Sequence, residues 1–102
     1  MPVKKTFPVV HPGEILGDWL TDFAITRYRL ASDLGVDATA IGNIVRGKRS
    51  ITAEMDVMLS RFFSMTPGFW LSLQMDYDLQ RTIEEKSATI NRRVKRLKQT
   101  AA

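Results

Sequence analysis

The chain has 102 residues, 44% of them hydrophobic, and its 15 Lys and Arg against 11 Asp and Glu give a net charge of +4, with one His and no Cys. Such a chain forms a single domain around its own core, and its residue types exclude a disulfide framework and leave little for catalysis, so we expect neither an enzyme nor a cofactor or small-molecule substrate. No stretch is as apolar as a membrane span and the first residues lack the apolar run of a secretory signal, so we expect a cytoplasmic protein without a membrane partner.

Apolar residues recur at helical intervals along the chain, and no stretch shows the alternation of a half-buried strand, so we expect an all-α fold of five helices. The first helix is predicted to begin at His11-Pro12-Gly13-Glu14. Proline suits the first helical position, and Glu14 can reach back to the His11 backbone as in a capping box. His11 is then a cap or packing residue rather than an acid, a base or a metal ligand. The inward face is expected to consist of Ile15, Leu16, Trp19, Leu20 and Phe23.

The second and third helices are predicted to be short and almost continuous. Thr26 is the predicted N-cap of a helix from Arg27 to Leu34, which Gly35 ends. Asp37 is the predicted N-cap of the third helix, and Gly47 suits the left-handed residue that closes it. Two short helices joined by so few residues around a glycine must cross steeply. Their inward residues are expected to be Tyr28, Leu30, Ala31 and Leu34 in the second helix and Ile41, Ile44 and Val45 in the third.

A polar, basic loop over residues 48–50 separates the third helix from the fourth. Thr52 is the predicted N-cap of the fourth helix, whose first turn is acidic. Thr66 and Pro67, a cap followed by proline, predict the start of the fifth helix. Aromatic side chains at helical spacing are expected in the core rather than in a cofactor site. The inward residues are expected to be Met55, Leu59, Phe62 and Phe63 in the fourth helix and Phe69, Trp70, Leu73 and Tyr77 in the fifth.

The basic charge is concentrated in the last part of the chain. Residues 81–102 carry seven basic and two acidic side chains, whereas residues 1–80 carry eight basic and nine acidic ones. We therefore expect a helical domain over residues 1–80 and a basic C-terminal helix or tail over residues 81–102. The second part is either a frayed, solvated tail or a helix that docks on a partner chain or lies along phosphates. As a helix, it would align the apolar residues Ile83, Ile90, Val94 and Leu97.

Residues 27–46 fit the helix-turn-helix pattern at the positions where that motif is mechanically constrained. Ala31 is small where the two helices cross, and Gly35 lies in the turn, where a side chain would penalise a positive φ. Ile41 and Ile44 are the apolar anchors that seat the second helix of the motif on the first. The pattern predicts binding to double-stranded DNA, and a helix pair used only for protein contacts is the alternative.

The third helix is the predicted recognition helix, which would enter the major groove. Asn43 can pair with adenine through its amide, Thr39 can hydrogen-bond a base edge or a phosphate, and alanine methyl groups can meet a thymine methyl. The expected base-contacting residues are Ala38, Thr39, Ala40 and Asn43, and Gly42 also faces outward. The expected phosphate-contacting residues are Thr26, Arg27, Arg46, Lys48 and Arg49. Asp37 would face the phosphates with the wrong charge unless helix capping absorbs its carboxylate.

One helix-turn-helix unit covers half of a DNA site, so useful affinity normally requires two units about 34 Å apart along the duplex. A homodimer is therefore expected. The candidates for joining the two chains are the aromatic surface of the fifth helix and the segment around Ile90, Val94 and Leu97. The sequence does not choose between them.

Several segments of the chain carry a more specific pattern than the helix-turn-helix alone. They read HPGEIL at residues 11–16, YRLA at 28–31 followed by LGV at 34–36, GKR at 47–49 with ITAEM at 51–55, and PGFWLSLQ at 67–74 with YDL at 77–79. Together they resemble the HigA-type antitoxins of the Xre, or lambda-repressor-like, group. The likeness spans residues 11–80, and residues 81–102 lie outside it.

This resemblance implies a lambda-repressor-like fold and a dimeric antitoxin that holds a RelE-like, ribosome-dependent mRNA endonuclease toxin inactive through a folded surface. It also implies repression of the protein's own operon by binding a palindromic operator. Two alternatives stay open: a stand-alone helix-turn-helix transcription regulator, and a protein-interaction antitoxin with little DNA binding. Family members usually carry polar or basic residues where Ala38, Ala40 and Gly42 stand, so the resemblance does not give the operator sequence.

Overall fold

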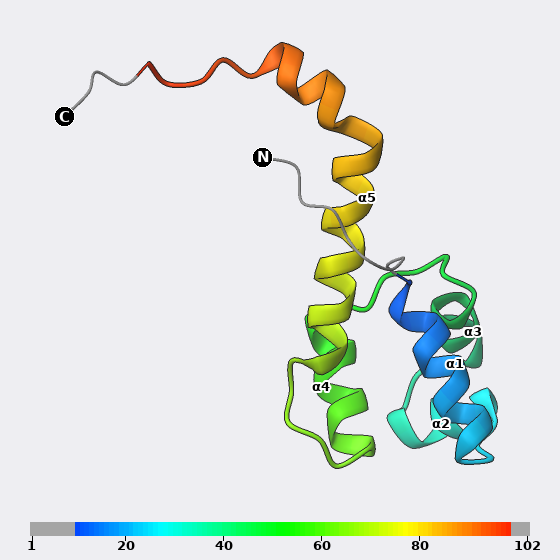
Figure 1. Ribbon diagram of the computed structural model, residues 1–102. Coiled ribbons are helices and arrows are strands. Elements are labelled where there is room, and N and C mark those ends of the chain that lie inside the picture. Colours follow the sequence, from blue (N-terminus) through cyan, green and yellow to red (C-terminus); the bar gives the residue numbers. More distant parts are fainter. Residues whose placement is uncertain (1–9, 99–102) are drawn as a thin grey trace.

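The computed structural model describes residues 10–98 and contains five α-helices and no strand in that range (Figure 1). This confirms the predicted all-α fold. Residues 1–9 and 99–102, at the outer ends of the two predicted parts, lie outside the described residues. The helices are α1 (Pro12–Asp22), α2 (Arg27–Leu34), α3 (Ala38–Val45), α4 (Ala53–Phe62) and α5 (Phe69–Arg93).

The first four helices and the beginning of α5 form a small body, from which the rest of α5 projects as an arm (Figure 1). Helix α3 packs against α1 and α2, and α5 packs against α4 and α1. The arm makes the molecule elongated, with dimensions of 58 × 25 × 25 Å. The core contains one large aromatic side chain among aliphatic ones and comprises Leu16, Leu20, Leu30, Ala31, Ile41, Ile44, Ile51, Met55, Leu59 and Trp70.

Three of the predicted N-caps make the expected side-chain hydrogen bonds. Nδ1 of His11 accepts from the Gly13 N–H at 2.9 Å, which confirms His11 as a cap. The hydroxyl oxygens of Thr26 and Thr52 accept from backbone N–H groups three residues later, at 3.0 and 3.1 Å. The reciprocal half of the capping box, from the His11 N–H to the Glu14 carboxylate, is absent from the described hydrogen bonds. The Glu14 carboxylate is exposed, and the Glu14 N–H donates to the His11 carbonyl at 2.9 Å.

Three residues expected to face inward are exposed. Tyr28 is 64% exposed, Phe23 is 61% exposed and Phe69 is 38% exposed, so these three predictions were wrong. Phe69 is the first residue of α5, and its ring stacks on Trp19 at the edge of the core. Successive residues of a helix are about 100° apart around its axis. Leu30, Ala31 and Leu34 share one narrow stripe of α2, whereas Tyr28 lies well outside that stripe, beside Arg27. Phe23 is the C-cap of α1, where the helix has already ended.

Helix α5 begins at Phe69, after Gly68, and not at the predicted Thr66-Pro67. Its N-terminal N–H groups are satisfied by a residue of α4. Oδ1 of Asp56 accepts from the Gly68 N–H at 2.8 Å, and Oδ2 accepts from the Leu71 N–H at 2.6 Å. Asp56 is only 2% exposed. A buried carboxylate from another helix therefore sets where α5 begins.

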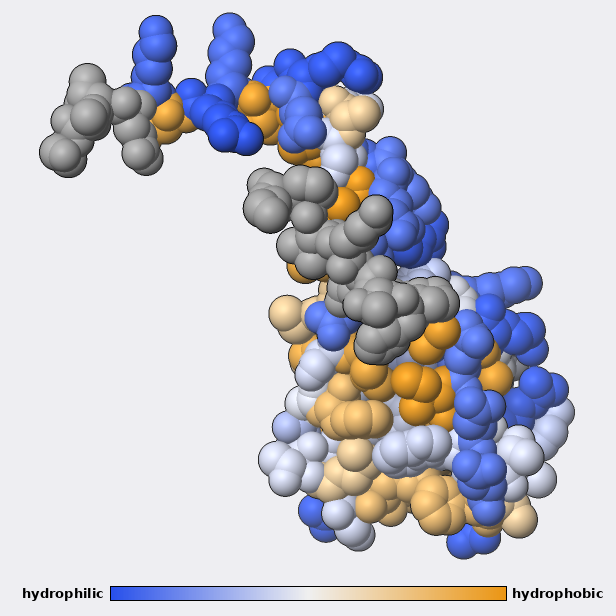
Figure 2. All heavy atoms as spheres, in the orientation of Figure 1, coloured by the Kyte–Doolittle hydropathy of each residue, from blue (hydrophilic) through white to orange (hydrophobic). Residues whose placement is uncertain are grey.

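Helix α5 runs without a break through residue 81 and ends at Arg93. Residues 81–93 are therefore helical, and the remaining described residues, 94–98, are not. The arm is covered mostly by hydrophilic side chains, with a few hydrophobic ones between them (Figure 2). Within residues 10–98, no helix combines the length and the apolar character that a membrane crossing needs.

Candidate nucleic-acid interface

The turn between α2 and α3 has the geometry that the helix-turn-helix pattern requires. Gly35 adopts the left-handed conformation, with φ of 76°, and the N–H of Val36 bonds to the Ala31 carbonyl at 2.9 Å. Ala31 is buried where the helices meet, and Ile41 and Ile44 of α3 are buried beside it. An alanine at position 35 would be strained in this backbone conformation whatever the space around it. These contacts fix the crossing of α3 over α2.

A second close approach holds α3 from the opposite side. A Cβ atom added to Gly13, at the start of α1, would collide with the backbone carbonyl of Ile44. The ring of His11 also lies within 3.7 Å of the position that a Cβ at Gly47 would occupy. Helix α3 is therefore packed between α1 and α2, and its remaining face points outward, where it can contact a partner.

The outward face of α3 carries Thr39, Gly42, Asn43 and Arg46, which recur at helical intervals. Thr39 and Arg46 are exposed, Asn43 is half-buried, and Gly42 is buried. Arg46 donates from Nη2 to Oδ1 of Asn43 at 2.9 Å. The two predicted base-contacting alanines, Ala38 and Ala40, are half-buried on the flanks of this face.

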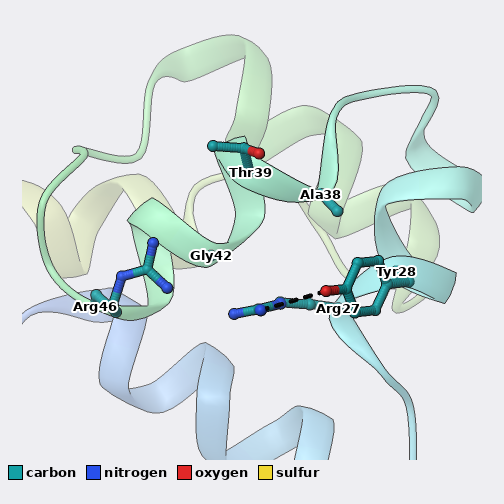
Figure 3. A pocket seen from close by; sticks show the side chains of 6 residues that line it. All are labelled: Arg27, Tyr28, Ala38, Thr39, Gly42 and Arg46. Atoms are coloured by element: carbon teal, nitrogen blue, oxygen red, sulfur yellow. Dashed lines mark hydrogen bonds between the residues drawn. The ribbon is translucent and has the colours of Figure 1, made fainter.

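A cavity of about 110 Å³ lies between the start of α2 and the outward face of α3 (Figure 3). Four predicted site residues line it, namely Arg27, Ala38, Thr39 and Arg46. Two further residues, Tyr28 and Gly42, also line it and were not among the predicted base or phosphate contacts. The cavity does not include the remaining predicted site residues, which are Thr26, Ala40, Asn43, Lys48 and Arg49.

Tyr28 belongs to this cavity through its contact with Arg27. The guanidinium carbon of Arg27 lies 5.3 Å from the centre of the Tyr28 ring, and Nη2 donates to the phenol oxygen at 3.4 Å. The hydrogen bond from Arg27 lowers the pKa of the Tyr28 phenol, and the nearby positive charge acts in the same direction. The adjacency of an arginine and a tyrosine at a helix start was the signal in the sequence that could have placed Tyr28 here.

The loop after α3 presents two further predicted phosphate contacts. Lys48 and Arg49 are exposed, and their backbone N–H groups donate to the Asn43 backbone carbonyl at 2.8 and 3.2 Å. The end of the loop is anchored by Gln74 of α5, whose buried Oε1 accepts from the Ile51 N–H at 2.8 Å. The sequence gives no signal for this role of Gln74, because its partner lies 23 residues away.

The exposed charges at the start of α2, on the outward face of α3 and in the loop after α3 are mostly positive. Within residues 10–98 the ion pairs are Arg29 with Asp33 and Arg81 with Glu85, so the interface arginines belong to neither. Asp37 is the N-cap residue of α3 but makes no side-chain capping hydrogen bond, and it is exposed. Capping therefore does not absorb its carboxylate. The exposed cations on this side are Arg27, Arg46, Lys48 and Arg49.

The comparisons with known proteins agree with this geometry. No family model matches the chain. Over 86 residues the chain is 36% identical to virulence-associated protein I of Dichelobacter nodosus, covering 83% of this chain and 80% of that protein. An addiction module antidote protein of the HigA family from Coxiella burnetii shares 34% identity and a TM-score of 0.82, over 89% of this chain and 100% of its own. The chain belongs to the HigA antitoxin family.

A further HigA structure, that of the Pseudomonas aeruginosa antitoxin with the higBA promoter, shares 35% identity and a TM-score of 0.83, over 89% of this chain and 100% of its own. The resemblance found in the sequence is thereby confirmed. Because these matches cover 89% of the chain, the likeness to HigA proteins extends beyond residues 11–80.

Proposed function

We propose that this chain is an antitoxin that represses its own operon by binding operator DNA through the face formed by α2 and α3. The observation that carries this proposal is the free face of α3, flanked by exposed and unpaired cations, in a chain of the HigA family. The Pseudomonas aeruginosa relative, whose structure includes the higBA promoter, supports the same assignment. DNA affinity rises with the number of phosphates that a protein neutralises, and this face supplies the charges to do so.

In this proposal Thr39 and Asn43 read base edges in the major groove, and the methyl groups of Ala38 and Ala40 meet thymine methyl groups at the flanks. Thr26, with its hydroxyl already accepting from the Arg29 N–H, can still donate to a phosphate. The cationic contacts to phosphate are assigned to Arg27, Arg46, Lys48 and Arg49. Asp37, an exposed acid without a side-chain capping hydrogen bond, would oppose binding.

A homodimer would place two such faces on a palindromic operator. The exposed apolar residues of α5 support this, since Met75, Leu79, Ile90 and the C-cap Val94 recur at helical intervals and are between 40% and 64% exposed. Of the second dimerisation segment considered from the sequence, Ile90 lies in α5 and Val94 is its C-cap, whereas Leu97 lies beyond the end of the helix. We propose that α5 joins the two protomers along this stripe.

The antitoxin role requires a toxin partner, which we propose to be a RelE-like mRNA endonuclease. Coexpression with the protein encoded beside this chain tests the assignment. Suppression of that protein's growth inhibition, together with co-purification of the two chains, is the expected result. Growth inhibition that persists at equal expression would contradict the antitoxin role and favour a stand-alone transcription regulator.

Titration of the purified protein against the DNA upstream of its own gene tests the repressor role. Two salt concentrations and a scrambled duplex of the same length complete the experiment. We expect selective binding to the upstream DNA that weakens steeply with salt. Equal, weak binding to both duplexes would contradict the repressor role and favour an antitoxin that acts through protein contacts alone.

A further inference from the structure

The cavity between α2 and α3 brings two cationic groups over one glycine. A Cβ atom added to Gly42 would lie 3.3 Å from Nη1 of Arg27 and 3.4 Å from Nη1 of Arg46. Figure 3 shows the two side chains extending toward each other beside Gly42. Gly42 is buried because these guanidinium groups cover it, and the position has no side chain of its own to fill the space.

Each guanidinium group is held by a neighbour and keeps free donors. Arg46 donates one N–H to Asn43, and Arg27 donates one to Tyr28 while lying over its ring. An arginine has five N–H donors in a fork that matches the oxygens of a phosphate group. Most of the donors on both side chains therefore remain available to a ligand in the cavity.

Two like charges at such close range repel each other, and an anion between them removes that repulsion. The ion pairs of the described residues leave both Arg27 and Arg46 without an acidic partner. The residues that line the cavity include no Asp or Glu. The arrangement is therefore complementary to one anionic group carrying several acceptor oxygens.

We infer that Arg27 and Arg46 close together on a single phosphate group of the operator backbone, and that Gly42 leaves the room for it. This inference rests on the proposed DNA-binding function and goes beyond it. It makes the two arginines one site and gives Gly42 a positioning role. A phosphate held jointly by the start of α2 and the end of α3 would fix the register of α3 in the groove.

The substitution Gly42→Ala distinguishes the proposed positioning role of Gly42 from a role in folding. Alanine is a better helix former than glycine, and its Cβ would meet only the far ends of two flexible side chains. We therefore expect Gly42→Ala to raise Tm by about 4 °C. The same substitution puts a methyl group against both guanidinium groups, in the room proposed for the phosphate. It should therefore weaken DNA binding by about tenfold.

The test uses the full chain and its upstream duplex, in which one phosphate at a time is replaced by a neutral methylphosphonate. The parent protein should lose affinity at one particular position in each half-site. Arg27→Ala and Arg46→Ala should each bind about tenfold more weakly than the parent, and both should become insensitive to replacement at that same position. Arg29→Ala is the matched control, because it removes a positive charge from α2 that is paired with Asp33 and lies outside the cavity.

The salt dependence gives a second readout. If the two arginines share one phosphate, the double variant should lower the slope of log K against log salt by about 0.9, and if they contact separate phosphates, by about 1.8. Sensitivity of the two single variants to different methylphosphonate positions would overturn the inference. So would a Gly42→Ala protein that binds as tightly as the parent.

Three further outcomes are distinguishable from these. A parent protein that fails to bind the duplex would overturn the proposed function and the inference together. Both single variants could instead lose the preference for one base pair, while no methylphosphonate position affects the parent. That result would show that the two arginines contact a guanine base and would overturn the phosphate assignment. Inorganic phosphate that shifts the Arg27 and Arg46 Nε–H resonances, without any methylphosphonate effect, would overturn the DNA source and leave a free-phosphate site.

Discussion

Arg46 holds the side chain of Asn43 through a 2.9 Å hydrogen bond from Nη2 to Oδ1, along the outward face of α3. This bond orients the amide before any ligand arrives and uses one of the two lone pairs on Oδ1. The other lone pair remains for a base. The predicted base contact and one predicted phosphate contact are therefore coupled within the protein itself.

Asn43→Ala is expected to reduce discrimination at one base pair by about 1–3 kcal/mol, because the bidentate contact to adenine is lost. Affinities for duplexes that each carry one substituted base pair measure this. Arg46→Ala should weaken binding to all of them and also relax part of the same preference, since the amide is no longer oriented. An Asn43→Ala protein with the parent's base preferences would show that another residue reads the bases.

Asp37→Asn should increase DNA affinity for every sequence alike. The exposed carboxylate makes no side-chain capping bond. At the proposed interface it would therefore stand beside the phosphates as a free negative charge. We expect a gain of about 0.5–1 kcal/mol, the size of a charge interaction at about 4 Å in water. Asparagine is as good an N-cap as aspartate, so stability should change little.

Fluorescence anisotropy at low salt measures the effect of Asp37→Asn. Asp18→Asn, an equal charge change on the exposed side of α1, is the control and should leave affinity nearly unchanged. If both variants gain equally, net charge alone explains the effect, and Asp37 is not at the interface.

Asp56→Ala should destabilise the fold by about 3 kcal/mol. The change removes the acceptor of the Gly68 and Leu71 N–H groups and of the Ser60 hydroxyl, all near the buried junction of α4 and α5. Urea unfolding followed by circular dichroism gives the free energy of unfolding. Glu54→Ala, an exposed acid in the same helical turn, should cost far less. Equal losses would show that helix charge matters here more than these hydrogen bonds.

The stability of the fold should decrease as the pH falls below 6.5, the ordinary pKa of histidine. Burial lowers the pKa of His11, outweighing the attraction of Asp78 and Glu14, and Arg81 lowers it further. The unfolded chain therefore takes up the proton at a higher pH than the folded one, so lowering the pH through this window favours unfolding. Protonation of Nδ1 would also break the cap to the Gly13 N–H.

Urea unfolding at pH 7.5 and pH 5.5 tests this, with His11→Asn as the comparison. Asparagine keeps a capping oxygen but does not titrate. The variant loses the edge contact with the Tyr77 ring, so its absolute stability should be lower, but its stability should change less between the two pH values. The same pH dependence in both proteins would rule out His11 as its origin.

The parts of the fold that follow from local residues could be predicted from the sequence. Thr26 and Thr52 cap the helices that follow them, and Gly35 adopts the left-handed turn conformation, because each depends on only a few neighbouring residues. The start of α5 could not be found in this way. It depends on Asp56, which lies 12 residues before Gly68 and meets it only after α4 and α5 have packed.

The candidate site shows the same division. Arg27 and Arg46 were each predicted as phosphate contacts from charge and position alone. That they converge over Gly42 depends on how α2 and α3 cross and on the side-chain directions, neither of which a linear pattern contains. Gly42 itself gave only a weak signal, since a glycine inside a helix has several explanations.

Amide chemical-shift mapping of the protein bound to its upstream duplex tests most directly whether the α2–α3 face is the DNA interface. We expect the largest shifts within residues 26–49, with Thr39, Asn43 and Arg46 among them, and no change on the outward face of α1. Shifts confined to α1 or to the arm of α5, with α3 unaffected, would contradict this assignment.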